Sequence, residues 1–182
     1  MAKTAVLFKS NYGATKQYAL HIAQALEADL FDMSRVKKFD FNKYDRLIFG
    51  GGIYAGKVNG LKFIKCNADR LTGKNLVVFT VGLGDPTVAS NAKMIMKSVD
   101  KALPKALMGR IHIYSFRGGL DWNKLKFPHG FMMKTLNSML SKKKAEELTD
   151  EDRNILDNYG KAVDLTNMES TNALIEYVKS LN

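Results

Sequence analysis

Residues 5–15 read AVLFKSNYGAT, and this stretch decides the fold. Its four apolar residues at the start predict a buried strand, and helical spacing follows from Thr15 to Ala28. At such a strand-to-helix turn, unpaired backbone N–H groups and the helix dipole favour an anion. Ser10 and Thr15 add hydroxyl donors, and Gly13 allows a turn that other residues resist. The stretch predicts a phosphate site, with an ordinary turn in which Thr15 is the N-cap as the alternative.

The same alternation of strand and helix continues along the chain. Further strands are expected at Asp29–Met33, Arg46–Phe49, Leu76–Val81 and Arg110–Phe116. Helices are expected at Leu61–Leu71, Ser90–Leu103 (with Met94, Ile95, Val99 and Leu103 inward), Thr149–Leu165 and Ser170–Leu181. This pattern predicts an α/β fold, a doubly wound parallel sheet with helices on both faces. Right-handed crossovers bring the loops after the strands to one edge, where ligands bind: residues 10–15, 50–56, 82–86 and 117–119.

The composition is that of an ordinary globular protein and predicts one domain over residues 1–182. A single cysteine, Cys66, excludes an internal disulfide and a cysteine-rich metal site, and three histidines without metal spacing suggest no other. The sequence has no signal-peptide pattern and no apolar stretch long enough to span a bilayer. These features favour a cytoplasmic protein that binds no metal.

The net charge of +10 favours an anionic partner, with simple solubility as the alternative. A basic insertion is expected at about 120–149, because Leu120–Lys144 holds six lysines and one aspartate. An apolar stripe at helical spacing runs through it, preceded by aromatic residues: Met132, Met133, Leu136, Met139 and Leu140, after Trp122, Phe127 and Phe131. This pattern predicts either contact with an anionic membrane, at its inner face, or a stripe packed on the domain beneath solvated lysines.

The loops resemble those of the flavodoxin family. That family's phosphate loop has hydroxyl residues around one glycine, as Ser10, Gly13 and Thr15 do here, while Tyr12 stands where a second hydroxyl residue is common. Residues 50–56, with Tyr54, resemble the loop that places an aromatic side chain against the flavin ring. Residues 82–85 resemble the third loop, whose backbone meets the polar edge of the ring, but no second aromatic follows.

The resemblance implies an FMN-binding oxidoreductase or electron-transfer protein with a five-stranded sheet in the order 2-1-3-4-5 and a helical insertion after the last strand. No catalytic side chain is assigned, because the cofactor carries the chemistry. The residues expected to bind FMN lie in three loops: Ser10, Asn11, Tyr12, Gly13, Ala14 and Thr15; Gly52, Ile53, Tyr54, Ala55 and Gly56; Gly82, Leu83, Gly84 and Asp85.

The insertion is similar to that of the menaquinone-dependent protoporphyrinogen dehydrogenases, flavodoxin-type enzymes with aromatic and basic residues there. That resemblance implies a porphyrinogen as substrate and a membrane quinone as acceptor. Three alternatives stay open: an electron carrier for a protein or small-molecule partner, this dehydrogenase, and an interaction module without flavin. Nucleic acid is not expected as a partner, because no aromatic-basic motif or recognition helix is present.

Overall fold

The computed structural model describes residues 3–54 and 56–181, which form two compact units. The first unit joins the residues up to Gly118 with those from Thr166 onward, and the second is Gly119–Leu165. No helix within the described residues has both the length and the apolar character needed to cross a membrane.

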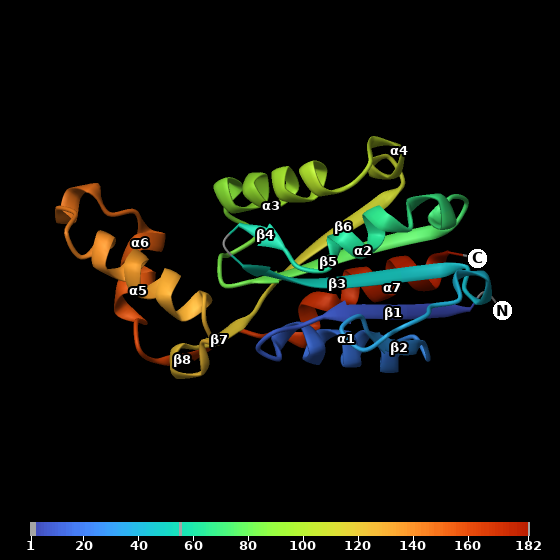
Figure 1. Ribbon diagram of the computed structural model, residues 1–182, viewed down its shortest axis with the longest axis horizontal. Helices are drawn as coiled ribbons and strands as arrows, with labels where there is room; N and C mark the ends of the chain where they lie inside the picture. The colour runs from blue at the N-terminus through green and yellow to red at the C-terminus, as the bar shows by residue number, and fades with distance from the viewer. Residues whose placement is uncertain (1–2, 55, 182) are drawn as a thin grey trace. The chain divides into compact units, whose positions relative to one another are not determined.

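The first unit is built on a parallel sheet. Its five parallel strands are β1 (Thr4–Lys9), β2 (Asp29–Asp32), β3 (Arg46–Tyr54), β5 (Asn75–Gly82) and β6 (Ile111–Arg117), in the order β2-β1-β3-β5-β6 (Figure 1). The short β4 (Lys57–Val58) pairs antiparallel with the end of β3. Numbered along the chain, the parallel strands have the order 2-1-3-4-5, so the expected topology is confirmed.

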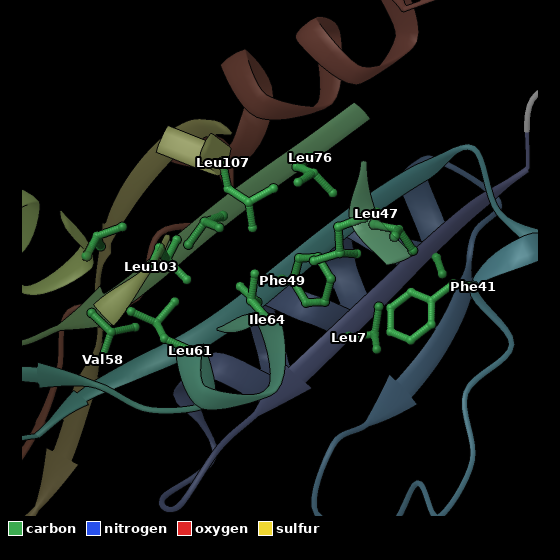
Figure 2. Packing of buried hydrophobic residues seen from close by; sticks show 14 of the residues in the cluster. Leu7, Phe41, Leu47, Phe49, Val58, Leu61, Ile64, Leu76, Leu103 and Leu107 are labelled. Atoms are coloured by element: carbon green, nitrogen blue, oxygen red, sulfur yellow. The ribbon is translucent and has the colours of Figure 1, made fainter. Parts of the chain in front are cut away.

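Helices cover both faces of this sheet, because alternate residues of each strand point to opposite sides. Leu7, Phe49 and Val78 face α2 (Leu61–Cys66) and α3 (Ala89–Ala102), in the cluster that Figure 2 shows. Val6, Ile48 and Val77 face α1 (Ala14–Ala25) and α7 (Asn172–Ser180). Shorter helices complete the unit: η1 (Phe41–Lys43), η2 (Ala68–Leu71), α4 (Lys105–Met108) and η5 (Met168–Thr171).

The second unit contains the expected insertion and extends to Leu165. An antiparallel pair, β7 (Gly119–Asp121) and β8 (Ala162–Asp164), brings its ends together. Between these strands lie η3 (Trp122–Lys124), α5 (His129–Leu140), η4 (Ala145–Glu147) and α6 (Asp150–Asp157). The rings of Trp122 and Tyr159 meet edge to face at 5.0 Å, and Lys143 pairs with Asp152 at 3.0 Å.

Two expectations about the helices are wrong. The helix expected over Thr149–Leu165 ends at Asp157, because Gly160 turns the chain with a φ of +78° and Ala162–Asp164 pairs as a strand. On α3, Met94 is 47% exposed, because the buried face runs through Asn91, Ile95 and Val99. The Asn91 side chain donates a hydrogen bond to the Asp85 carbonyl at 3.1 Å, which makes its burial tolerable.

Candidate functional site

The loop after β1 is a compact turn at the start of α1. Gly13 is the N-cap residue of α1, with a φ of +107° that other residues rarely adopt. Its N–H donates to Ser10 Oγ at 3.1 Å. The alternative with Thr15 as N-cap is wrong, because Thr15 is buried inside the first turn of the helix. That turn carries no acidic residue, so the helix dipole remains available to an anion.

Tyr54, at the end of β3, reaches back to this loop. Its hydroxyl oxygen accepts a hydrogen bond from the Asn11 N–H at 3.2 Å, and its ring meets that of Tyr12 edge to face at 5.7 Å. Burial raises the pKa of the Tyr54 hydroxyl, and hydrogen bonds from the N–H groups of Asn11 and Tyr12 offset part of the rise. The Asn59 side chain adds a second link by donating to Asn11 Oδ1 at 3.2 Å.

The glycines 50–52 lie inside β3, whereas the sequence placed them in the loop after it. A Cβ at Gly50 would lie 2.1 Å from the Phe79 ring, and one at Gly51 would lie 2.2 Å from the Asn59 carbonyl oxygen. A Cβ at Gly52 would lie 2.7 Å from the Tyr54 hydroxyl. Glycine is therefore favoured here by the close approach of neighbouring groups to a strand, and β3 continues to Tyr54.

The loop after β5 is fixed through Asp85. This carboxylate accepts hydrogen bonds from the Thr87 N–H at 2.9 Å and from the Thr87 hydroxyl at 2.6 Å. Arg117 Nη1, at the end of β6, lies 3.8 Å from it. The Thr87 hydrogen bonds, assisted by Arg117, hold the pKa of Asp85 below its ordinary value. Arg117 Nε is buried without a hydrogen-bond partner in the described part of the chain, which leaves a donor at this edge.

The expected loops meet at the carboxyl edge of the sheet. Ile53 packs against Gly82, so that a Cβ added at Gly82 would lie 3.1 Å from Ile53 Cδ1. A Cβ added at Gly118 would lie 3.5 Å from the Ala14 Cβ. Leu83 and Gly84 form the bend after β5, and Gly56 turns the chain with a φ of +71°. Ala55 lies outside the described residues.

Sequence reasoning placed Arg117 in a loop at this edge but gave it no role, and it missed Asn59. Nothing in the sequence marks Asn59.

These residues fit the phosphate of FMN. The Asn11 N–H of the loop already donates to an oxygen, that of the Tyr54 hydroxyl, and a phosphate oxygen can accept the same kind of hydrogen bond. Ser10 lies in this loop, and Thr15 follows in the first turn of α1. Within the described residues, no group of three or more His, Cys, Asp or Glu is placed to hold a metal ion.

A family model described as a flavodoxin domain matches residues 5–147. The chain belongs to the flavodoxin domain family. Membership confirms the flavodoxin-like fold expected from the sequence.

This flavodoxin-family chain is 28% identical over 88 residues to a quinone-linked protoporphyrinogen IX dehydrogenase of Escherichia coli K12. The match covers 44% of this chain and 49% of the relative, so the chain spans about half the length of the curated relatives it matches. Solved structures also resemble it, and two of them serve as examples. A flavoprotein in complex with FMN from Lactobacillus acidophilus NCFM has a TM-score of 0.45 and 14% identity, with 64% of this chain and 93% of that chain covered. A flavoprotein from Bacteroides uniformis has a TM-score of 0.46 and 16% identity, with 64% and 91% covered. At these TM-scores the likeness carries no further argument.

Proposed function

We propose that this flavodoxin-family chain carries electrons on FMN held at the carboxyl edge of the sheet, with the phosphate in the loop Ser10–Thr15. The observation that carries the proposal is the turn before α1, where the Asn11 N–H already donates to an oxygen, that of the Tyr54 hydroxyl. Bound FMN supplies the redox chemistry by accepting and donating electrons, and the protein supplies its position and electrostatic environment. An electron donor or acceptor, whether protein, quinone or small molecule, is the expected partner.

Each loop has a distinct role in this proposal. Backbone N–H groups of Asn11–Thr15 and the hydroxyls of Ser10 and Thr15 hold the phosphate. The Tyr54 ring packs on the flavin, supported by the strand residues around Gly52 and Ile53 and by the turn at Gly56. Backbone groups of Gly82–Asp85 meet the polar edge of the ring, and the hydrogen bonds of Thr87 to Asp85 keep this loop in shape. Aromatic packing on a flavin contributes about 0.5–1.5 kcal/mol beyond burial.

Titration with FMN and with riboflavin tests the phosphate site. We expect FMN to bind more tightly, and the double change Ser10→Ala with Thr15→Ala to weaken FMN while leaving riboflavin nearly unchanged. A loss of about tenfold in FMN affinity corresponds to one lost charge-assisted hydrogen bond. Thr72→Ala is the control, because Thr72 is an exposed hydroxyl residue that follows η2 and precedes β5. Equal binding of both flavins by the unchanged protein would contradict the proposed site.

A second candidate, also a proposal, is a dehydrogenase that passes electrons from a porphyrinogen to a quinone at the surface of a membrane. The name of the E. coli relative favours it, and so does the second unit, where Phe127 is 87%, Phe131 67% and Met139 63% exposed. Lys126 precedes Phe127 in the sequence, and Lys134 lies between Phe131 and Met139. Exposed apolar residues beside lysines suit an anionic lipid surface.

Vesicle flotation and turnover test this second candidate. We expect the protein to float with vesicles containing anionic lipid, less with purely zwitterionic ones, and Phe127→Ser with Phe131→Ser to abolish flotation. Turnover of a porphyrinogen with a quinone is expected only if the dehydrogenase proposal holds. An FMN-loaded protein that neither floats nor oxidises a porphyrinogen would leave the electron carrier as the function.

A further inference from the structure

The side chain of Tyr54 lies over its own strand and ends in the phosphate loop. Gly52 makes room for it, because a Cβ there would lie 2.7 Å from the Tyr54 hydroxyl and 2.8 Å from the ring. The hydroxyl then accepts the Asn11 N–H at 3.2 Å, across 43 positions of sequence. The loop is thus closed by an oxygen from the end of β3, at the same edge of the sheet.

This oxygen stands where an anion would be bound best. The Asn11 N–H that it accepts lies two residues before Gly13, the N-cap residue of α1, and the helix dipole is positive at that end. A phosphate oxygen would form a stronger, charge-assisted bond with the same donor than a neutral hydroxyl does. One N–H makes a well-aligned bond to only one acceptor, so the tyrosine and a phosphate cannot both bind Asn11.

We propose that the Tyr54 hydroxyl is an internal substitute for a phosphate oxygen, which competes for the Asn11 N–H and must release it before a phosphate monoester binds there. The inference deepens the proposed FMN function and rests on it for the identity of that monoester. Leaving the loop also makes the Tyr54 ring available to pack on a flavin. Affinity for phosphate is reduced by the fraction of molecules in which the hydroxyl occupies the loop.

The test is the binding of inorganic phosphate, followed by phosphorus NMR, to the full chain and to Tyr54→Phe. Removing the hydroxyl is expected to tighten phosphate binding about fivefold, the equivalent of one net hydrogen bond. Tyr114→Phe is the matched control and should change nothing, because its hydroxyl points to the Ala173 carbonyl of α7 at 3.5 Å. Unchanged or weaker phosphate binding by Tyr54→Phe overturns the inference.

A second variant and a flavin titration separate the two proposals. Tyr54→Leu removes the ring as well as the hydroxyl, and it should tighten inorganic phosphate just as Tyr54→Phe does. If the unchanged protein binds FMN but neither variant tightens phosphate, the inference fails and the proposed function stands. If the unchanged protein does not bind FMN while both variants tighten phosphate, the proposed function fails and Tyr54 still competes for the loop.

Discussion

Gly13 holds the geometry of the phosphate loop through its backbone alone. A Cβ there would meet nothing within 4 Å, so the φ of +107° is the only obstacle to a larger residue. We expect Gly13→Ala to lower the free energy of unfolding by about 1–3 kcal/mol and, by turning the N–H groups away, to weaken FMN binding about tenfold. Chemical denaturation and FMN titration measure the two effects.

Gly73→Ala is the matched control for this change. Gly73 also has a positive φ, +82°, with nothing within 4 Å of a Cβ, but it lies at the opposite edge, just before β5. It should lose stability without losing FMN affinity. Equal loss of FMN affinity in both variants would mean that the Gly13 effect is general destabilisation.

Tyr44 gives the first unit a distinct dependence on alkaline pH. Its hydroxyl donates to Asp29 Oδ2 at 2.8 Å, and Lys3 pairs with the same oxygen at 2.9 Å. Burial, followed by the hydrogen bond to Asp29, raises the pKa of Tyr44 from 10.0 to about 12. The neutral hydroxyl is therefore favoured by folding, so its contribution to stability is complete below pH 10.0 and lost as the pH rises through about 12.

This pH dependence can be checked by measuring the unfolding free energies of the unchanged protein and of Tyr44→Phe from pH 9 upward. The difference between them should be constant at first and then shrink between pH 10.0 and about 12. Parallel curves over that interval would show that Tyr44 does not titrate as its surroundings require.

At the scale of elements, a side chain of the neighbouring strand β5 explains why β3 has a glycine at position 50. A Cβ at Gly50 would lie 2.1 Å from the Phe79 ring, which is fully buried in β5 and has no room to move. Gly50→Ala is expected to cost about 3 kcal/mol of unfolding free energy or more, as overpacking does. Combining it with Phe79→Leu should recover part of that loss, since the smaller side chain frees space.

Denaturant unfolding of the single and double variants measures this coupling. Gly109→Ala is the control, because nothing lies within 4 Å of a Cβ at Gly109 and its φ is not positive. A Gly50→Ala protein as stable as Gly109→Ala would contradict the packing described for β3 and β5.

The strands were predictable because a parallel sheet covered on both faces needs unbroken apolar runs, and the chain has them at residues 5–8 and 76–79. The glycines of β3 were misplaced because a glycine does not reveal whether it serves a turn or makes room for Phe79. The buried face of α3 was misjudged for a related reason. Asn91 is buried because its amide donates to the Asp85 carbonyl, and Met94 is exposed. A hydrophobic pattern predicts the opposite, a buried methionine and an exposed asparagine.

The candidate site divides in the same way. The three loops and their common edge follow from the order of strands, and so could be predicted without coordinates. The contact of Tyr54 with Asn11 could not, since it depends on the side-chain torsions of Tyr54 and on the absence of a Cβ at Gly52. Long-range contacts of this kind leave no pattern in one sequence.

At the scale of the whole molecule, the positive charge is divided unequally. The second unit, Gly119–Leu165, holds eight lysines and arginines and eight aspartates and glutamates, so the net charge of +10 resides in the first unit. Electron transfer from the FMN-loaded protein to an anionic acceptor such as ferricyanide should therefore slow as salt is added. The Debye length falls from about 10 Å at 0.1 M to about 3 Å at 1 M ionic strength. Stopped-flow rates over this range measure the effect, with a neutral quinone as control. Equal salt dependence for both acceptors would contradict it.

The two units also differ in what they contribute to the core. Of the described residues, none between 119 and 165 belongs to either apolar cluster of the sheet. The ends of the first unit meet without the second, because the Tyr18 hydroxyl donates to the Arg117 carbonyl at 2.7 Å and accepts the Asn167 N–H at 2.9 Å. A short linker between Gly118 and Thr166 should therefore replace the second unit without opening the sheet.

Such a shortened chain is expected to fold and to bind FMN within about threefold of the full chain, as measured by circular dichroism and flavin titration. Tyr18→Phe should lower the free energy of unfolding more in the shortened chain than in the full chain. In the shortened chain, only the linker and the Tyr18 hydroxyl join the segment that ends at Gly118 to the segment that begins at Thr166. A shortened chain that folds but loses FMN would place part of the cofactor's binding energy in residues 119–165. A shortened chain that keeps FMN but no longer floats with vesicles would instead separate the two functions. Electron transfer would then belong to the unit that contains the sheet, and lipid contact to the exposed side chains of α5.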